Sequence, residues 1–478
     1  MKISKLSKFG ELINLREDAE IKDISYDSRR VKKGDLFIAL IGRNFDGHIF
    51  VEDAFKHGAV AAVVSKKLDI NIPQLLVPDT REAMANISAF FYHYPSKYLH
   101  VTGVTGTNGK STTVFIIHKI LKKLRQKSSL VGTIEYEIAG KHIKADRTTP
   151  ESPDIQKFMY ETWKNDGKFF NMEVSSQSIC EKRVENIKFS SAVFTNLSRE
   201  HLEYHKTFEN YKKAKLEFFK KAAHPGATAY FNSDDPHYED FLRVFINSGG
   251  KRYYTYAIKK HGDIRAIEIC LSLEGAKFSI AYKGEKYHIK SKLIGTHNVY
   301  NILAAFGVLI NSGFDPHEIS LAIQEIPSVP GRLEKIEKHG INFFIDYAHT
   351  PEALRNVMQS LRKLTSNRII IVFGAGGNRD AGKRPLMGSI ASKFADFIIL
   401  TSDNPRSEDP LKIVNDIKSG ISGDNYLIEI DREKAIRKAF SLARTGDVIL
   451  VAGKGHEEYQ EVRGKKYHFS DREVILAL

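Results

Sequence analysis

The stretch LHVTGVTGTNGKSTTVFIIHKILKKL, residues 99–124, runs from an apolar segment through a glycine-containing turn into a helical pattern. A strand, a loop and a helix in this order point backbone N–H groups and the positive end of the helix at whatever fills the loop. Lys110 is placed to reach the outer phosphates of a nucleotide, and the Ser111 hydroxyl suits Mg²⁺. The stretch therefore predicts a phosphate-binding loop inside an α/β domain.

The match to the common phosphate-loop pattern is incomplete. The pattern G-x-x-x-x-G-K-[ST] needs a glycine five positions before Gly109, where this chain has Val104, so the variant loop relies on Gly103 and Gly106. A turn that merely starts a helix would not need GKST after a strand. The sequence contains no N-K-x-D, H-R-D or D-F-G signature, which disfavours a GTPase and excludes a protein kinase.

Apolar strand-like runs alternate with helical patterns along the rest of the chain, which is typical of mostly parallel sheets. We predict strands at 35–40, 60–65, 169–176, 191–198, 341–348, 368–377, 396–403 and 446–455, and helices at 50–59 and 80–93. Two proline-containing segments, 92–100 and 326–334, interrupt this pattern. The expected fold is α/β with three domains: a small α/β domain at 1–98, a central P-loop-type ATPase domain at 99–329 and a Rossmann-like domain at 330–478.

Composition limits the partners. The net charge is +14, but the positive residues are dispersed and accompany no recognised nucleic-acid module, so small anions are the expected partners, although a lysine-rich solvated surface would explain the same charge. No apolar run is long enough for a membrane span or a signal peptide, and Cys180 and Cys270 are the only cysteines. We therefore expect a cytoplasmic monomer that binds neither nucleic acid nor a membrane.

Ten spaced motifs resemble, in order, those of the Mur ligases of peptidoglycan synthesis. They are TGTNGKSTT (105–113), MEVSSQ (172–177), FTNLSREHLEYH (194–205), YKKAKLEFF (211–219), GTHNVYNILAA (295–305), GRLE (331–334), DYAHTPEAL (346–354), GAGGNRDAGKRPLMG (374–388), SDNPRSEDP (402–410) and VAGKGHEEYQ (451–460). Within the family they look like the enzymes that add the third amino acid. The resemblance implies that ATP phosphorylates the γ-carboxylate of D-Glu in UDP-N-acetylmuramoyl-L-Ala-D-Glu, and that an amine attacks the acyl phosphate to give an amide, ADP and phosphate.

The resemblance also assigns the catalytic and metal-binding residues. The catalytic residues would be Lys110, Glu173, His201 and Lys215, and Mg²⁺ would be held by Ser111, Glu173, His201 and Lys215 as a carbamate. A carboxylate brought against the γ-phosphate crowds negative charges, so such a site needs cations and oriented dipoles. An ordinary ammonium would be repelled by Mg²⁺, whereas CO₂ addition turns the lysine into an anionic ligand.

The same resemblance implies the substrate contacts. ATP would contact Gly106, Thr107, Asn108, Gly109, Lys110, Ser111, Thr112, Asn298, Asn301, Arg332 and Asp346. UDP-N-acetylmuramoyl-dipeptide would contact Tyr26, Ser28, Arg43, Asn44, Phe45, Arg147, Thr148, Thr149, Ser175, Glu181 and Arg183. Arg147 stands where the family usually has Asn and Glu181 where it usually has Gln, so both departures place a charge beside an anionic substrate.

The segment DNPR, residues 403–406, indicates which amino acid is added. Meso-diaminopimelate differs from lysine by one carboxylate, and a guanidinium can grip a carboxylate through two parallel hydrogen bonds, so Arg406 suits diaminopimelate. By resemblance the pocket comprises Arg379, Asp403, Asn404, Pro405, Arg406, Gly453 and Glu457. Its loop GAGGNRD departs from the usual GCGGDRD at Ala375 and Asn378.

Several alternatives stay open. Within the ligases they are a lysine-adding sibling and a folylpolyglutamate synthetase, and outside them a P-loop phosphotransferase or a catalytically silent nucleotide-binding module. The sugar-nucleotide segment at 24–48 and DNPR argue against the last two, since neither needs two further substrate sites around one ATP loop. A dehydrogenase is disfavoured because Arg379 takes the place of the last glycine of G-x-G-x-x-G.

Overall fold

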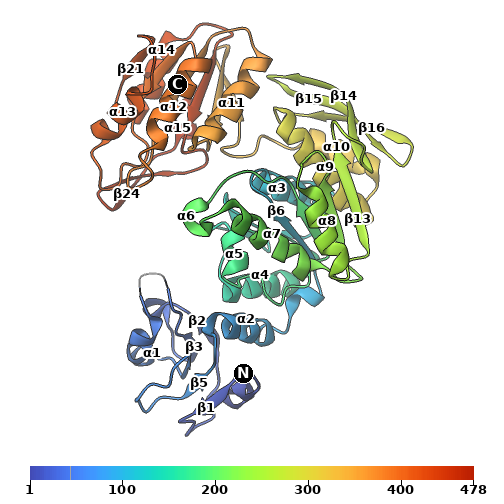
Figure 1. Cartoon of the computed structure of the whole chain (residues 1–478), viewed down its shortest axis with the longest axis vertical. Helices are drawn as coiled ribbons and strands as arrows, with labels where there is room; N and C mark the ends of the chain where they lie inside the picture. Colours follow the sequence, from blue (N-terminus) through green and yellow to red (C-terminus); the bar gives the residue numbers. More distant parts are fainter. Residues whose placement is uncertain (43–44) are drawn as a thin grey trace. The chain divides into compact units, whose positions relative to one another are not determined.

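The computed structural model describes residues 1–42 and 45–478 and divides into two compact units. Unit 1 comprises Met1–Arg265 and Leu303–Asp315, and unit 2 comprises Ala266–Ile302 and Pro316–Leu478. Each unit is built from β-sheets and the helices that cover them (Figure 1). Within the described residues, every helix is too short or too polar to cross a membrane.

The first sheet of unit 1 has the strand order β1-β5-β4-β3-β2, parallel except for β1. Its elements are η1 Ile3–Phe9, β1 Glu11–Ile13, β2 Asp23–Ser25, η2 Ser28–Arg30, β3 Asp35–Ile38, η3 Gly47–Phe50, α1 Val51–Lys56, β4 Ala61–Val64, β5 Gln74–Leu76 and α2 Thr80–Phe91. Asp79 caps α2 by accepting hydrogen bonds from the backbone N–H groups of Arg81 and Glu82. The strands and helices predicted in this region are confirmed.

The central sheet carries the phosphate loop. In unit 1 its order is β13-β12-β11-β6-β10-β7-β8-β9, parallel from β13 to β7, with β6 flanked by β11 and β10. The elements of this part are η4 Pro95–Lys97, β6 His100–Thr105, α3 Lys110–Lys123, β7 Ser128–Val131, β8 Tyr136–Ile138, β9 Lys141–Ile143, α4 Ser152–Lys164, β10 Phe169–Glu173, α5 Ser176–Cys180, β11 Ser191–Phe194, α6 Leu202–His205, α7 Phe208–Ala222, β12 Thr228–Asn232, α8 Tyr238–Asn247 and β13 Arg252–Ala257.

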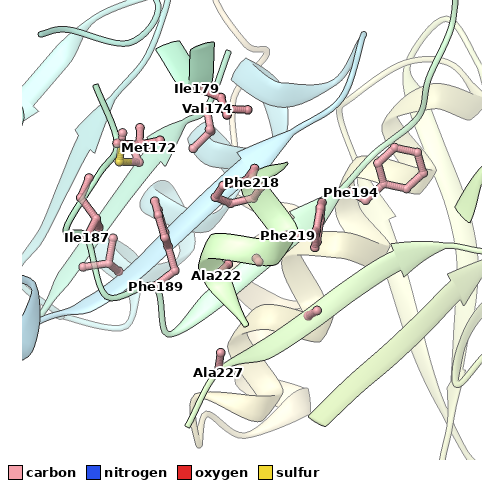
Figure 2. Packing of buried hydrophobic residues seen from close by; sticks show 14 of the residues in the cluster. Met172, Val174, Ile179, Ile187, Phe189, Phe194, Phe218, Phe219, Ala222 and Ala227 are labelled. Atoms are coloured by element: carbon pink, nitrogen blue, oxygen red, sulfur yellow. The ribbon is translucent and has the colours of Figure 1, made fainter. Parts of the chain in front are cut away.

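The two faces of this sheet differ. Met172 of β10 packs with Phe218 of α7 in a large apolar cluster that also receives α4 and α8 (Figure 2). The preceding residue, Asn171, points to the opposite face because side chains alternate along a strand, and its Nδ2 donates to Ser128 Oγ 2.9 Å away. Ser128 in turn bonds His118 of α3. The helix that starts at the phosphate loop therefore covers the second face.

Unit 2 contains a sheet of order β17-β18-β22-β19-β20-β21, parallel except for β17. Helices α11, α12 and α13 bury one face, and α14 and α15 bury the other, as a doubly wound sheet requires. The remaining elements are β14 Ile264–Ser272, β15 Gly275–Tyr282, β16 Glu285–Ser291, α9 Thr296–Asn311, α10 Pro316–Gln324, β17 Glu334–Lys338, β18 Ile341–Asp346, α11 Pro351–Leu364, β19 Ile369–Phe373, α12 Lys383–Phe394, β20 Phe397–Leu400, α13 Pro410–Lys418, β21 Tyr426–Ile428, α14 Arg432–Leu442, β22 Val448–Ala452, β23 Tyr459–Val462, β24 Lys465–His468 and α15 Asp471–Leu476. The four strands predicted here and the α/β fold class are confirmed, whereas β21, short and only half-buried, was not predicted.

Candidate active site

The loop between β6 and α3 has the form of a phosphate cradle. Gly109 occupies the N-cap position of α3 with φ = 86°, and within the described chain no side chain caps this helix. Gly106 has φ = 147°, and a Cβ there would lie 1.9 Å from Thr195 Oγ1. The backbone thus demands glycine at both positions, and the first N–H groups of α3 face the loop.

A neighbouring segment holds the loop in place. Thr107 N–H donates to the Asn196 carbonyl at 2.8 Å, and Asn108 N–H donates to Asn196 Oδ1 at 3.0 Å. The Thr195 hydroxyl donates to the Asn108 carbonyl at 2.6 Å. The loop is therefore pre-shaped by the segment that follows β11.

Two lysines converge on the carbonyl groups of the loop. Lys110 Nζ donates to the carbonyls of Thr107 at 2.7 Å and Gly106 at 3.0 Å, and Lys215 Nζ donates to the Gly106 carbonyl at 2.7 Å. Burial, and then the charge of Lys110, hold the pKa of Lys215 well below its ordinary value. Its amine is consequently far easier to deprotonate than that of a surface lysine.

Tyr211 lies between Lys215 and the loop, a position that the sequence did not reveal. Its fully buried hydroxyl lies 3.0 Å from Thr107 Oγ1, and Lys215 Nζ lies 4.8 Å from its ring centroid. The rings of His201 and His205 lie 6.1 and 5.3 Å from it. The available signal was the four-residue spacing in YKKAK, which puts Tyr211 and Lys215 on one face of α7.

Glu173 ends β10 with a buried carboxylate. Its Oε1 accepts a hydrogen bond from Thr133 N–H at 2.6 Å, but its Oε2 is buried and has no hydrogen-bond partner within the described residues. Burying a carboxylate oxygen without a partner costs free energy of folding unless a cation binds to it. The donor chemistry therefore fits Mg²⁺, which prefers carboxylate oxygen.

His201 is placed differently from Glu173. It lies at the start of α6 in the left-handed conformation, with φ = 56°, and its side chain is 42% exposed. Its ring nitrogens face Glu203 at 3.4 Å and Glu200 at 3.7 Å. The structure thus brings Lys110 and Lys215 together at the loop. The partners of His201 are instead the carboxylates of Glu200 and Glu203. Ser111 lies half-buried in the first turn of α3.

The residues expected to hold the muramoyl dipeptide adjoin Glu173. Thr149 Oγ1 donates to the Glu173 carbonyl at 2.9 Å, and Ser175 N–H donates to Thr149 Oγ1 at 3.1 Å. Arg183 Nη1 donates to the Thr149 carbonyl at 2.8 Å. The hydroxyls of Thr148 and Thr133 lie 3.0 Å apart. Three of the predicted contacts thus form one hydrogen-bonded group at the end of β10.

The two unusual charges, Arg147 and Glu181, belong to one ion-pair network. Arg147 pairs with the buried Glu151, and Glu181 pairs with Arg183. Glu151 also lies 3.2 Å from Arg183 Nε and 3.4 Å from Arg81 Nη1. Three arginines and two glutamates leave one net positive charge, which suits an anionic substrate.

Two of the remaining predicted contacts, Tyr26 and Ser28, follow β2 of the first sheet. The Tyr26 hydroxyl donates to Asp154 Oδ2 at 2.6 Å, and burial followed by the Asp154 charge raises the pKa of Tyr26. Ser28 is buried, whereas Phe45 is 59% exposed. Arg43 and Asn44 lie outside the described residues.

Of the predicted ATP contacts of unit 2, Asn298, Asn301 and Asp346 are buried and Arg332 is half-buried. Asn301 Nδ2 donates to Asn298 Oδ1 at 3.0 Å, which confirms that both share one face of α9. Asp346 accepts hydrogen bonds from Leu333 N–H at 2.7 Å and Ala348 N–H at 2.8 Å, and burial raises its pKa despite Arg332. The Arg332 guanidinium lies 4.9 Å from the Tyr347 ring.

The loops that follow β20 and β22 meet at the predicted amino-acid pocket. Asn404 Nδ2 donates to Glu457 Oε2 at 2.8 Å. Gly453 has φ = 110°, and a Cβ there would lie 2.5 Å from Asp403 Oδ2. Four residues assigned from separate motifs thus lie together in the folded unit.

Arg406, from the loop after β20, contacts the loop after β19, which carries Arg379. Arg406 Nη1 donates to the Gly377 carbonyl at 2.7 Å. A Cβ on Gly376 would lie 3.0 Å from Arg406 Nη1 and 3.7 Å from Arg379 Cγ, and one on Gly377 would lie 2.0 Å from the Pro405 carbonyl. The structure therefore places the Arg406 guanidinium and the side-chain stem of Arg379 beside Gly376.

Lys454 is a buried member of this pocket that the sequence did not single out. Its side chain is fully buried, and Nζ lies 3.2 Å from both Asn404 Oδ1 and Glu457 Oε2. It holds the amide and the carboxylate in fixed orientations. Its position between two glycines in VAGKGHE was the only local signal.

Three family models match the chain. They describe the Mur ligase middle domain at residues 104–309, the glutamate ligase domain of Mur ligases at 331–455 and the catalytic domain of the Mur ligase family at 20–92. Together they cover most of the chain, including the loop at 106–109 and the pocket at 403–406.

Individual relatives agree with these matches. A UDP-N-acetylmuramoyl-L-alanyl-D-glutamate–2,6-diaminopimelate ligase from Clostridium botulinum is 42% identical, and the alignment covers 96% of this chain and 95% of the relative. A solved structure of a ligase of that name is 31% identical, with a TM-score of 0.71 over 100% of this chain and 98% of the other. The MurF ligase of Thermotoga maritima, solved with ADP, is 20% identical, with a TM-score of 0.65 over 90% of this chain and 93% of the other, and shares the fold. Sequence, fold and site together establish that this chain belongs to the Mur ligase family.

Proposed function

We propose that this ligase couples ATP hydrolysis to the addition of meso-2,6-diaminopimelate to the D-Glu γ-carboxylate of UDP-N-acetylmuramoyl-L-Ala-D-Glu, a step in making the peptidoglycan precursor. The observation that carries the choice of amino acid is the pair of arginines beside Gly376, next to the Asn404–Glu457 pair. A guanidinium suits a carboxylate and Glu457 suits an ammonium, so the pocket matches the free end of a diamino diacid. The 42% identity to the diaminopimelate ligase supports the same choice.

The residues around the phosphate loop have separate tasks in the proposed reaction. The start of α3 and Lys110 bind the phosphates of ATP, so that a second anion, the D-Glu γ-carboxylate, can approach them. The carboxylate oxygen attacks the γ-phosphorus and ADP leaves. The amine then attacks the acyl carbon, loses a proton, and expels inorganic phosphate.

Lys215 is proposed to act as a carbamate. Its lowered pKa supplies the neutral amine, whose nitrogen forms a bond to CO₂ and releases one proton, which leaves an anionic side chain. Glu173, this carbamate, His201 and Ser111 would hold Mg²⁺. When bound, Mg²⁺ offsets the negative charge of the phosphates. This assignment is supported by the buried Glu173 Oε2, which has no hydrogen-bond partner among the residues that the structure describes.

The first test compares amino acids. Purified protein with UDP-N-acetylmuramoyl-L-Ala-D-Glu, ATP and Mg²⁺ is expected to release phosphate with meso-diaminopimelate and to have a kcat/KM at least about 100-fold lower with L-lysine, which leaves buried polar groups unpaired. Reactions without an amino acid or without the nucleotide substrate serve as controls. Equal kcat/KM values would refute the specificity.

Isotope tracing tests the chemistry separately. With ¹⁸O in the D-Glu γ-carboxylate, one labelled oxygen is expected in the released phosphate. In the second step the amine breaks the bond between the acyl carbon and the bridging oxygen, so that this oxygen leaves with the phosphorus. Unlabelled phosphate would rule out the acyl phosphate whatever amino acid is used.

A further inference from the structure

A buried arginine and aspartate lie beneath the amino-acid pocket, outside every motif described above. Arg432 is the first residue of α14, and Asp471 is the first residue of α15. Arg432 Nε lies 2.7 Å from Asp471 Oδ1 and Nη2 lies 2.8 Å from Oδ2, so the pair is bidentate, and neither side chain is exposed. This geometry is the strongest form of a side-chain ion pair.

The guanidinium also contacts the backbone of both pocket loops. Arg432 Nη2 donates to the Ala452 carbonyl at 3.0 Å, and Nη1 donates to the Ser402 carbonyl at 3.4 Å. Ala452 is the last residue of β22 and precedes Gly453, and Ser402 immediately precedes Asp403. One side chain thus contacts the points at which both loops leave the sheet.

No ladder of the sheet could make this connection. Strand β19 lies between β22 and β20, so the two loops start from strands that are not neighbours. Backbone pairing fixes each strand against β19 but leaves the chain beyond the last pair to other contacts. Arg432 contacts the chain on both sides of β19. Its bidentate pair with Asp471 fixes the orientation of the guanidinium that makes these contacts.

The electrostatics agree with this placement. Burial opposes the charge of Arg432, but Asp471, and beyond it Asp403 and Glu457, outweigh burial and raise the pKa of Arg432. Arg432 therefore stays charged beside two acidic pocket residues. The charged Arg432 side chain therefore joins the residues that directly precede the two loops that carry the pocket side chains.

We propose that Arg432 and Asp471 are positioning residues that hold the loops 403–406 and 453–457 at the spacing needed to bind the amino-acid substrate. The identity of that substrate rests on the proposed function. The linkage of the two loops is independent of it. Neither residue touches the substrate in this proposal. Their effect is transmitted through the backbone at Ser402 and Ala452.

The test uses the full-length protein with Arg432→Lys and Asp471→Asn, because lysine keeps the charge and cannot make all four contacts. The matched control is Arg437→Gln, which removes an exposed pair with Glu433 on the same helix. We expect the KM for meso-diaminopimelate to rise at least about tenfold in both variants, while the KM for ATP changes less than about twofold. The control is expected to match the parent enzyme.

Hydrogen–deuterium exchange followed by mass spectrometry provides a readout independent of substrate. Faster exchange confined to peptides spanning 402–406 and 453–457 supports the proposal, even if the parent protein proves inactive with diaminopimelate, an outcome that would count against the proposed function alone. Faster exchange throughout unit 2 would show a merely structural role and overturn it. Unchanged exchange and unchanged KM in Arg432→Lys would overturn it as well.

Discussion

At the scale of single residues, the site depends on groups whose surroundings change their chemistry. Lys215 is the main case, because burial beside Lys110 disfavours its charged form. A lysine held in this way lowers stability and gains reactivity. Glu173 is an acidic residue in a similarly unfavourable environment, because one of its carboxylate oxygens is buried without a hydrogen-bond partner within the described residues.

Lys215→Met is expected to lower activity at least about 100-fold and to raise the melting temperature at pH 7 in buffer depleted of CO₂. Between the lowered and the ordinary pKa, the folded state binds fewer protons than the unfolded state, so the free energy of unfolding of the parent rises with pH across that window. The variant lacks this slope. Thermal unfolding at pH 7 and pH 9 measures the change in melting temperature and the loss of its pH dependence.

The control for this prediction is Lys212→Met, which removes a partly exposed lysine of α7 that pairs with Asp240. It is expected to keep its activity. Lys215→Ala is expected to recover part of its activity when formate or acetate is added, since a small carboxylate can replace the carbamate. Full activity of Lys215→Ala without an additive would contradict the carbamate.

At the scale of elements, the phosphate loop shows how two segments share one geometry. The loop after β6 takes its shape from hydrogen bonds to Thr195 and Asn196, which follow β11. Gly106 sits where these segments approach most closely. The shape of the loop therefore depends both on its own glycines and on the segment that follows the adjacent strand β11.

Gly106→Ala is expected to weaken ADP binding by about 10- to 100-fold, because its Cβ would collide with Thr195 and its φ of 147° strains an L-residue. Gly140→Ala is the control, since Gly140 also has a positive φ, of 82°, but nothing lies within 4 Å of its Cβ position. Calorimetric titration with ADP makes the comparison. Gly140→Ala, in the turn between β8 and β9, is expected to bind ADP as tightly as the parent, so equal affinities in the two variants would contradict the prediction.

The sequence predicted the elements and the loops that carry motifs, but not the contacts that fix those loops. Apolar runs such as 369–373 reveal strands because burial on both faces requires a continuous apolar pattern. The pairing of Arg432 with Asp471 joins residues 39 positions apart and leaves no periodic signal. The contacts of Lys454 with Asn404 and of Tyr211 with Thr107 also join distant residues, although the spacing of Tyr211 and Lys215 did place both on one face of α7. The exposure of His201 could not be deduced from its motif.

At the scale of the whole molecule, the charge of the chain is opposite to the charge of the two nucleotide substrates proposed for it. The chain carries a net charge of +14, whereas ATP and the nucleotide-linked dipeptide are polyanions. Opposite charges raise the rate of encounter, and salt screens the effect over about 8–10 Å at physiological ionic strength. Diaminopimelate has two carboxylates and two ammonium groups, so its encounter should be insensitive to salt.

Raising the ionic strength from about 20 mM to about 200 mM is therefore expected to lower kcat/KM several-fold for the nucleotide-linked dipeptide and to leave that for diaminopimelate nearly unchanged. Steady-state kinetics with each substrate varied in turn give both values. A parallel decline for both substrates would indicate a general effect of salt on the protein instead.

The order of strands in unit 2 has one more consequence. Because β19 separates β22 from β20, the backbones that carry the two pocket loops leave the sheet about 9.6 Å apart, twice the interstrand distance. Hydrogen bonds of the main chain set this length within the sheet, and Arg432 contacts the chain where the loops begin, so exchanging side chains in the loops alters the charges there but not this backbone separation. Because Asn404 and Glu457 nevertheless meet across this gap, 2.8 Å apart, it is the length of the side chains that decides how short a molecule can be and still contact both loops.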